Sequence, residues 1–257
     1  MIEIQNLRAG YDGKAILDID HLRFDDGKIT AIVGLNGSGK STLLKSIVGM
    51  NAGVQGNSGS VFIDGKNLRA LSHKQRAKLV AYLPQMHQNA NLDVYTLVCH
   101  GRFPYLGFSK ILGEKDLALI ENALRLTDMW EKRDKNLSEI SGGEKQRAYL
   151  AMVIAQDTKM ILLDEPATYM DIKHQVEVIE VLSRLAKEGR GIVLTSHDLP
   201  QSFSICDRVC LMQSGKIVAQ GTAEEVLCDG ETVRRVMGVS LKKSEECDSL
   251  YRYNLIQ

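Results

Sequence analysis

The first residues that could do chemistry lie between positions 34 and 42, which read GLNGSGKST. The pattern GxxxxGK[ST] is typical of a phosphate-binding loop when it follows an apolar strand, here 29–33, and precedes a helix, here 40–49. Its glycines let backbone N–H groups converge on a phosphate, and the helix N-terminus adds positive potential. A plain glycine-rich turn is the alternative, which this context disfavours. The pattern predicts a nucleotide site formed by Gly34, Leu35, Asn36, Gly37, Ser38, Gly39, Lys40, Ser41 and Thr42.

Two of these side chains have specific tasks in such a loop. The ammonium group of Lys40 reaches the β- and γ-phosphates, and the hydroxyl of Ser41 is a ligand for Mg²⁺. Thr42 is expected on the side of the α-phosphate. The loop therefore predicts binding of a nucleoside triphosphate with its magnesium ion.

A pair of carboxylates, Asp164 and Glu165, ends the apolar run 160–163. Because side-chain direction alternates along a strand, the two carboxylates point to different places. Asp164 is expected at the Mg²⁺ shell, where it contacts the metal through a water, and Glu165 is expected toward the γ-phosphate and the water that attacks it. Acidic capping of a strand end is the simpler alternative, but the phosphate loop favours the catalytic interpretation.

A turn with the sequence Ser-Gly-Gly at 141–143 precedes a predicted long helix, 145–156. The free N–H groups at a helix start form a second anion site. An ordinary N-cap by Ser141 is the alternative interpretation of this turn.

The hydrophobic pattern indicates the elements that hold these motifs. Alternation over 2–7 and 15–24 predicts an antiparallel pair of strands. Apolar runs separated by helical patterns predict a parallel sheet, with ligand sites at the carboxyl ends of its strands. Residues 86–113 are expected to be irregular and to lie at a surface or interface. The other predicted strands are 29–33, 80–83, 160–164 and 191–195, and the predicted helices are 40–49, 76–79, one from about 114, 145–156, 172–188 and one after Thr222.

Composition excludes several classes of protein. The 257 residues are 44% apolar and 25% charged, so the chain is globular and long enough to bury a core. No apolar run exceeds the eight residues of 148–155, which excludes a membrane span, and the N-terminus has no signal-peptide pattern. Thirty-two basic and 32 acidic residues leave no net field for coating nucleic acid. Five cysteines without a CxxC pair argue against a disulfide framework or a zinc ribbon, and they are expected to be buried or inert.

The order of these motifs, with Ser196-His197-Asp198 after them, resembles the nucleotide-binding subunit of an ATP-binding cassette (ABC) transporter, from Tyr11 to about residue 238. The resemblance implies an α/β fold: a P-loop NTPase cassette with a parallel-sheet core, an N-terminal antiparallel β edge and a helical insertion. The expected boundaries within a single domain are a nucleotide-binding core at 1–85 and 159–235, a helical subdomain at 86–158, and a C-terminal tail at 236–257 that is charged and frayed over 242–248.

The resemblance also assigns roles to single residues. Tyr11 resembles the aromatic residue that stacks on adenine, and His197 the histidine that contacts the γ-phosphate. Tyr11 as a packed surface aromatic and His197 as a strand cap are the simpler alternatives. Asp171 falls where the family has an aspartate that crosses the dimer interface. The implied catalytic residues are Glu165, His197, Lys40 and Gln85, and the implied metal site is Ser41, Gln85 and Asp164.

The family works as a dimer of two copies, in which ATP lies between the phosphate loop of one subunit and the signature turn of the other. The signature is usually LSGGQ, and here it is ISGGE at 140–144. The resemblance therefore implies that Ser141, Gly142, Gly143 and Glu144 contact the nucleotide of the second copy. Glutamate in place of glutamine adds a negative charge close to that nucleotide.

A membrane permease is the implied partner, with a substrate-binding protein as an indirect one and the cytoplasmic face of the membrane as the location. We expect the permease to dock on 85–110, because Leu97, Val98 and the aromatic segment 101–105 are apolar within a stretch predicted to be exposed. A core-packed loop is the alternative for this stretch.

The expected cargo is a metal chelate of the iron-siderophore, haem or cobalamin kind. The sequence GRFP at 101–104 and the stretch DEPATYMDIKHQ at 164–175 resemble segments of the ATPases that serve such importers. Import of zinc or manganese is the second interpretation. A soluble ABC ATPase without a membrane partner and a nucleotide sensor without turnover are the rival functions. The sensor is disfavoured because Asp164, Glu165 and His197 are all present.

Overall fold

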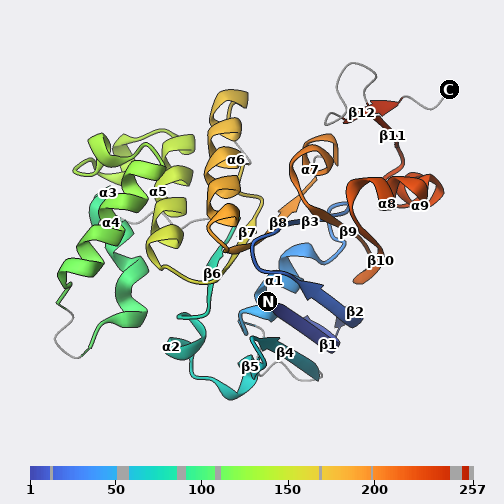
Figure 1. Cartoon of the computed structure of the whole chain (residues 1–257), viewed down its shortest axis with the longest axis horizontal. Coiled ribbons are helices and arrows are strands. Elements are labelled where there is room, and N and C mark those ends of the chain that lie inside the picture. The colour runs from blue at the N-terminus through green and yellow to red at the C-terminus, as the bar shows by residue number, and fades with distance from the viewer. Residues whose placement is uncertain are drawn as a thin grey trace.

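The computed structural model describes residues 1–11, 14–50, 58–85, 91–107, 111–167, 170–197, 199–243 and 251–254. Its main sheet has six strands (Figure 1). Five of them run parallel to one another, and the sixth, Lys216–Gly221, which comes last in the sequence, pairs antiparallel with its neighbour. This confirms the predicted parallel core. In spatial order the strands are β10 (Lys216–Gly221), β9 (Arg208–Gln213), β3 (Ile29–Val33), β8 (Gly191–Ser196), β7 (Met160–Asp164) and β6 (Val80–Leu83).

A second sheet confirms the antiparallel edge at the N-terminus. Strands β1 (Ile2–Tyr11) and β2 (Lys14–Phe24) pair from Ile2 opposite Phe24 to Tyr11 opposite Lys14. Strands β4 (Ser58–Ile63) and β5 (Lys66–Asn67) extend the sheet in the order β2-β1-β4-β5.

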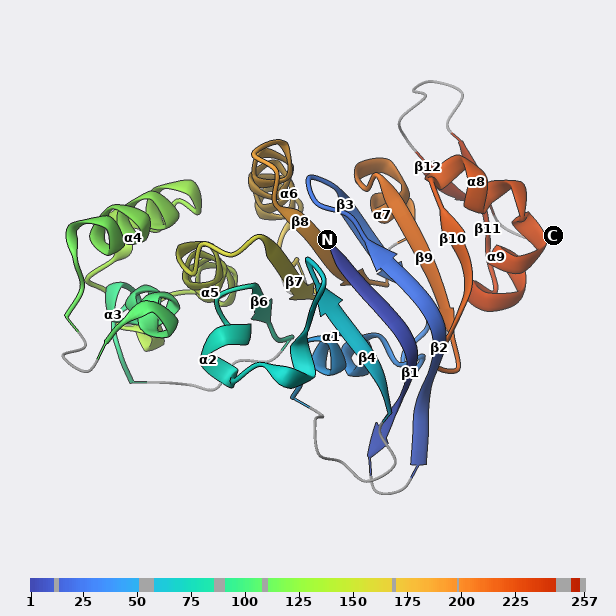
Figure 2. The same ribbon diagram turned by 60° about the horizontal axis from the view of Figure 1, so that its bottom comes forward.

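Helices cover both faces of the main sheet (Figures 1 and 2). Helix α1 (Lys40–Ile47) lies between the two sheets, where its leucines pack in one core cluster with the inward side chains of β1. Helix α6 (Ile172–Lys187) packs on the other face, as part of a second cluster that also contains Ala31 and Val33 of β3. The central strands β3, β7 and β8 are buried on both faces, as parallel sheets require. Helix α7 (Leu199–Ile205) lies beside α6 on the same side.

The helical insertion lies at one end of the molecule and differs from the prediction at one point. Residues 86–113 were expected to be irregular, yet helix α3 (Val94–Cys99) and the 3₁₀ helix His100–Tyr105 form within them. The side chain of Asp93 caps α3 by accepting the N–H of Thr96 at 2.6 Å, and Val94, Leu97 and Val98 are buried at helical spacing. The insertion also contains α4 (Glu114–Leu126), two short 3₁₀ helices (Trp130–Lys132 and Leu137–Glu139) and α5 (Gly142–Ala155).

Three further boundaries differ from the prediction. Helix α2 is His73–Arg76 rather than 76–79, and α5 begins at Gly142 rather than at 145. The capping box of Ser72 with Gln75, which the sequence predicts, and the N-cap by Ser141, its alternative for the signature turn, are both present, and each helix begins directly after its cap. The C-terminal tail holds a hairpin in place of a frayed end at 242–243. This part of the chain contains α8 (Ala223–Cys228), α9 (Gly230–Met237), β11 (Ser240–Lys243) and β12 (Tyr251–Asn254).

Candidate nucleotide-hydrolysis site

The phosphate loop connects β3 to α1 at the carboxyl edge of the main sheet. Gly39, the N-cap of α1, has a φ of 108°, which is favourable only for glycine, and no side chain caps the helix. A Cβ at Gly34 would lie 2.3 Å from the carbonyl oxygen of Met212, so the loop touches the end of β9. The N–H of Gly215 donates to the carbonyl of Ser38 at 2.8 Å, which fixes the loop from the same side.

The loop has the donors that a phosphate group needs. The Oγ of Ser38 is buried and has no hydrogen-bond partner, which leaves a donor for an incoming oxygen. The Nζ of Lys40 donates to the carbonyls of Gly34 at 2.7 Å and Leu35 at 3.3 Å, and the side chain is buried. Burial lowers the pKa of Lys40, whereas the carboxylates of Glu165 and Asp164 raise it. The unpaired hydroxyl of Ser38 and the buried ammonium of Lys40 together fit an anion.

Asp164 lies at the end of β7, is 2% exposed, and accepts three hydroxyl hydrogen bonds. Its Oδ1 accepts from Ser41 Oγ at 3.0 Å and from Thr195 Oγ1 at 2.7 Å, and its Oδ2 accepts from Tyr82 at 3.4 Å. Burial, and then the charge of Asp164, raise the pKa of Tyr82, so this phenol stays a donor. The structure therefore brings together Ser41 and Asp164, as the sequence predicted.

This corner also fits a magnesium ion. Mg²⁺ prefers a few oxygen ligands from the protein and completes its shell with phosphates and water. A carboxylate next to a hydroxyl is such a set. Among the described residues no group of three or more His, Cys, Asp and Glu side chains is placed to form a cage for another metal.

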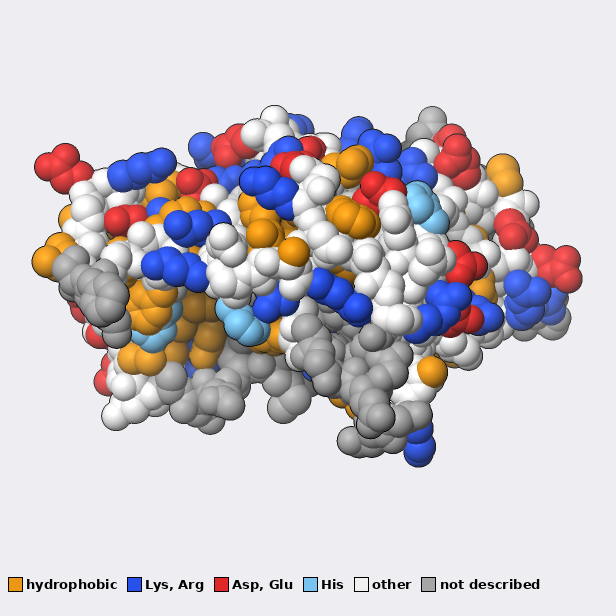
Figure 3. Space-filling view, turned by 90° about the horizontal axis from the view of Figure 1, so that it is seen from below, with side chains coloured by type: hydrophobic (Ala, Val, Ile, Leu, Met, Phe, Trp, Pro, Cys, Tyr) orange, Lys and Arg blue, Asp and Glu red, His pale blue; other side chains and the backbone are white. Residues whose placement is uncertain are grey.

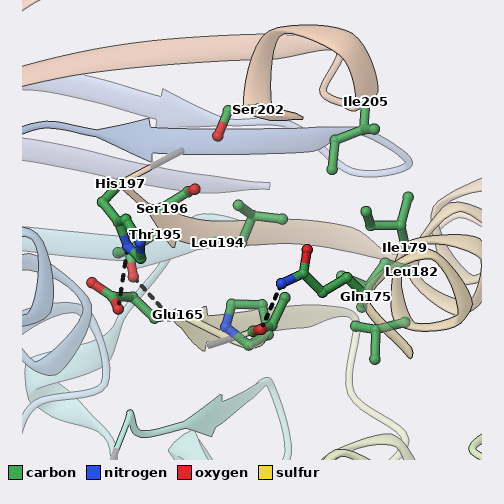
Figure 4. A pocket seen from close by; sticks show the side chains of 13 residues that line it. Glu165, Gln175, Ile179, Leu182, Leu194, Thr195, Ser196, His197, Ser202 and Ile205 are labelled. Carbon is green, nitrogen blue, oxygen red and sulfur yellow. Dashed lines mark hydrogen bonds and ion pairs between the residues drawn. The ribbon is translucent and has the colours of Figure 1, made fainter. Parts of the chain in front are cut away.

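Glu165 turns away from the strand that precedes it. Its φ of 52° lies in the left-handed region, which is uncommon for residues other than glycine. In this conformation its Oε2 accepts from Gln85 Nε2 at 2.9 Å and lies 3.5 Å from Nδ1 of His197 (Figure 4). The predicted catalytic residues Gln85, Glu165 and His197 therefore meet at one point, although β6, β7 and β8 are separate in the sequence.

A cavity of about 180 Å³ opens beside this group, between α6, α7 and β8 (Figure 4). Glu165, Thr195 and His197 line one end of it, and Val178, Ile179 and other apolar side chains line the rest. No residue of the phosphate loop lines this cavity. It is therefore distinct from the place that the phosphates would occupy.

The signature turn forms the start of α5. The Oγ of Ser141 accepts the N–H of Glu144 at 3.3 Å, and Glu144 accepts the N–H of Ser141 at 2.8 Å, which is a capping box. A Cβ would meet nothing within 4 Å at Gly142, so this part of the turn is open. Lys132 pairs with the carboxylate of Glu144 and, together with the N–H of Ser141, lowers its pKa to about 2. That the turn contacts the nucleotide of a second copy stays a prediction.

Two other predicted residues lie at the edges of the site. Tyr11 is the last residue of β1, and the neighbouring strand contacts the phosphate loop: a Cβ at Gly39 would lie 3.0 Å from Leu17 Cδ2. Asp171 caps α6 by accepting the N–H of His174 at 3.0 Å, and its side chain is mostly exposed. Their roles in adenine stacking and dimer contact stay predictions. Asp198 lies outside the described residues.

The expected docking stretch is only partly a surface. Leu97 and Val98 are core residues, and Arg102 is 3% exposed. The guanidinium of Arg102 donates to Asp116 at 2.8 Å and to the carbonyl of Ala155 at 2.9 Å, and it lies over the ring of Tyr105. The prediction that these residues form an exposed patch is therefore wrong, and for Leu97, Val98 and Arg102 the core-packed alternative holds. Phe103 remains exposed at 54%.

Figure 3 shows the lower face of the molecule, where hydrophobic side chains gather at the end formed by the helical subdomain. Phe103 stacks on His100, with ring centroids 4.5 Å apart. Among the described residues of the stretch, Phe103 is therefore the exposed large hydrophobic side chain, and His100 beside it is half-buried.

The cysteine prediction is confirmed in part. Cys99, Cys206, Cys210 and Cys228 are free, and burial raises the pKa of Cys206 and of Cys210 to about 12. Cys228 is exposed, so of the two expected states, buried or inert, burial does not apply to it. Cys247 lies outside the described residues.

Three residues of the site were not predicted from the sequence: Tyr82, Lys132 and Thr195. Thr195 gives one signal, because it is a polar residue that ends the apolar run 191–194 directly before the Ser196-His197 motif. The other two have no signal in a single sequence, since their contacts depend on how the subdomain and the sheet fold.

Comparison with known proteins agrees with this geometry. The sequence model of the family described as ABC transporter matches residues 17–168. The petrobactin import ATP-binding protein YclP of Bacillus subtilis (strain 168) is 40% identical over 229 residues, which are 88% of this chain and 89% of that protein. The iron(3+)-hydroxamate import ATP-binding protein FhuC of the same organism is 38% identical over 229 residues, which are 88% of this chain and 84% of that protein.

A solved structure shares the fold. CbiO1 from Clostridium perfringens, described as part of the ABC transporter complex CbiONQ, superimposes with a TM-score of 0.75 at 28% identity, covering 91% of this chain and 93% of that one. No helix in the described part of this chain has both the length and the apolar character needed to cross a membrane. The chain belongs to the ABC transporter family and is one of its ATPase subunits.

Proposed function

We propose that this ATPase powers the import of a metal chelate, an iron siderophore or a related haem or cobalamin compound, through a membrane permease. Two relatives that cover most of the chain are named as import ATP-binding proteins for petrobactin and for iron(3+)-hydroxamate. The motifs at 101–104 and 164–175 resemble the same group of importers. Similarity over 88% of the chain and similarity in these two segments support the same cargo class.

The contacts of Glu165 with Gln85 and His197 support the proposed hydrolysis mechanism. Glu165 Oε2 is held at 2.9 Å from the amide of Gln85, at the edge where the phosphate loop begins. From this position its carboxylate accepts a hydrogen bond from the attacking water and polarises it. His197 donates to the γ-phosphate, where negative charge develops.

The phosphate loop binds and orients the nucleotide. Lys40 moves its ammonium from the carbonyls of Gly34 and Leu35 to the phosphates, and the hydroxyl of Ser38 gains an acceptor. Ser41, Asp164 and Gln85 would hold Mg²⁺, and the bound ion would neutralise phosphate charge. Tyr11 stacks on the adenine ring. The contacts of Lys40, Ser41 and Asp164 at the carboxyl edge of the main sheet support their roles, and the role of Tyr11 rests on the family resemblance.

We infer that two copies of the chain form the complete ATPase. The signature residues Ser141, Gly142, Gly143 and Glu144 contact the nucleotide on the second copy, with Gly142 and Gly143 as backbone donors, and Asp171 crosses the interface. The open surface at Gly142 and the exposure of Asp171 support this arrangement.

The permease docks beside Phe103 and His100 at the cytoplasmic face of the membrane, and a substrate-binding protein delivers the cargo to the permease. We expect no nucleic-acid partner.

Glu165→Gln tests the mechanism, because it keeps the shape of the side chain and removes the base. The variant should bind ATP with Mg²⁺, form a stable dimer by size-exclusion chromatography, and hydrolyse ATP at least about a hundredfold more slowly. The exposed Glu188→Gln is the matched control and should behave as wild type. Unchanged turnover in the Glu165 variant would refute the assignment.

Growth of a deletion strain tests the cargo. We expect the strain to fail on one ferric siderophore, on haem or on cobalamin while growing on inorganic iron, and to recover with the intact gene. Loss of zinc or manganese uptake alone would refute the chelate assignment. Failure to co-purify with a polytopic membrane protein from detergent extracts would favour an ABC ATPase with a soluble partner.

A further inference from the structure

We propose that Thr195 is a positioning residue for hydrolysis: its hydroxyl joins the carboxylate of Asp164 to the backbone of Glu165 and so fixes the direction of the Glu165 side chain. The proposal rests on the proposed role of Glu165 as the group that polarises water. It concerns a residue that no motif of the sequence assigns.

The contacts of Thr195 are directional. Its Oγ1 donates to Asp164 Oδ1 at 2.7 Å and accepts the N–H of Glu165 at 2.9 Å. The side chain is fully buried, so water does not compete for either bond. Because an ionised carboxylate only accepts and an N–H only donates, the hydroxyl proton must point toward Asp164. The hydroxyl of Thr195 therefore links Asp164, the proposed metal-site residue, to Glu165, the proposed base.

The position of Thr195 in the sheet explains this coupling. Thr195 lies directly opposite Asp164, the last pair between β7 and β8. The chain leaves the strand at Glu165, whose φ is 52°. The N–H of Glu165 donates to the side chain of Thr195 and not to the backbone of a neighbouring strand. A buried N–H needs a partner, so the hydroxyl of Thr195 stabilises the turn at this residue.

The turn sets where the catalytic carboxylate lies. In the left-handed conformation Glu165 reaches Gln85 and His197, as Figure 4 shows for the histidine. In an extended conformation the side chain would alternate with that of Asp164 along the strand and would point to a different place. The hydrogen bond to Thr195 therefore selects the conformation in which the base meets its partners.

A buried threonine can also be merely structural, and the chain contains such a case for comparison. Thr158 is 3% exposed, lies before the other end of β7, and donates to the carbonyl of Met160 at 2.8 Å. This hydrogen bond lies at the end of β7 opposite to Asp164. Thr158→Val is thus a matched control for Thr195→Val, since both changes remove one buried hydroxyl and keep the shape.

Steady-state kinetics of purified full-length protein give the first test. Thr195→Val should lower kcat for ATP about tenfold or more, with the KM for ATP changed by less than about threefold. Thr195→Ser keeps the hydroxyl and should restore most of the rate. Thr158→Val should keep kcat within about twofold. Wild-type kcat in Thr195→Val, or equal losses in the valine and serine variants, would overturn the proposal.

A double-mutant cycle gives the second test and separates a positioning role from a structural one. In the Glu165→Gln background, single-turnover hydrolysis should slow by less than about twofold when Thr195→Val is added, because the group that Thr195 directs is already gone. A full tenfold further loss would show that Thr195 acts independently of Glu165 and would overturn the proposal. If Thr195→Val does not fold, Thr195→Ala replaces it in both tests, with the same expected results.

The two proposals fail in different ways. If Glu165→Gln turns over like wild type, the proposed role of Glu165 is wrong, whatever Thr195→Val does. If Glu165→Gln is slow and Thr195→Val has wild-type kcat, the hydrolysis mechanism stands and the role of Thr195 alone is refuted.

Discussion

The carboxylate of Glu144 forms an ion pair with Lys132, twelve residues earlier in the same helical subdomain. Glu144 stands where the family usually has glutamine in its signature, and the sequence alone suggested an uncompensated negative charge near the partner's nucleotide. The pair changes that expectation. Lys132 and the backbone N–H of Ser141 occupy the two carboxylate oxygens, so the turn carries a matched charge.

Lys132→Met should expose that charge. The unpaired carboxylate would face the triphosphate of the second copy, and we expect the KM for ATP to rise about fivefold at low salt, which corresponds to about 1 kcal/mol of unfavourable charge. The rise should be smaller at high salt because exposed charges are screened. ATPase measurements over a range of ATP and salt concentrations check this.

The double variant Lys132→Met with Glu144→Gln is the control for this prediction. It has neither charge and should recover the wild-type KM. Equal impairment of the single and double variants would show that Lys132 acts by packing and not by charge compensation.

Stability in acid should depend on the same pair. The pKa of Glu144 is lowered to about 2, from about 4.3 in an unfolded chain. A lowered pKa means that the ion pair stabilises the fold fully above about pH 5, and that this contribution is lost as the pH falls toward 2. Lys132 is 41% exposed, so we expect about 1 kcal/mol.

Denaturant unfolding of wild type and Glu144→Gln from about pH 6 to pH 3 measures this contribution. The difference in the free energy of unfolding should shrink as the pH falls. A difference that stays constant with pH would contradict the assignment of the shift to Glu144.

Lys40→Ala should abolish ATP binding. The loop loses its point charge, and the carbonyls of Gly34 and Leu35 lose their donor. We expect the affinity for a fluorescent ATP analogue to fall at least about a hundredfold. Lys45→Ala, in the last turn of the same helix, is the control. Retained affinity in the Lys40 variant would contradict the phosphate-loop assignment.

Phe103→Asp and Arg102→Glu should have different effects, although the two residues are adjacent. Phe103 is exposed, so its variant should keep the thermal midpoint and basal ATPase activity but lose co-purification with the permease and transport. Arg102 is buried, so its variant places a carboxylate against Asp116 and a backbone carbonyl and should lower the thermal midpoint by several degrees or prevent folding.

Leu117→Asp is the control for the docking surface, because Leu117 is 43% exposed on α4 of the same subdomain. It should leave both transport and the ATPase unchanged. If Phe103→Asp supports full transport, the permease docks elsewhere.

Local patterns predicted most of the catalytic edge, since the strand, loop and helix around Lys40 and the run ending at Asp164 are each continuous in the sequence. The error at 86–113 has a physical cause: α3 has only six residues, too few for a helical period to stand out beside Pro104 and the glycines. Thr195 was missed for another reason. Its two partners lie about thirty residues away and meet it only because β7 and β8 pair in one register.

The position of β3 in the middle of the sheet has a consequence for how the protein folds during its synthesis. The phosphate loop follows β3, yet the strand β9 and the segment containing Met212 and Gly215, which support the loop, come from the last quarter of the chain. A ribosome releases the loop long before it releases that support. The phosphate loop of the nascent chain therefore stays unsupported, and accessible to chaperones, until β9 has been synthesised. ATP can stabilise the fold by binding only after that point.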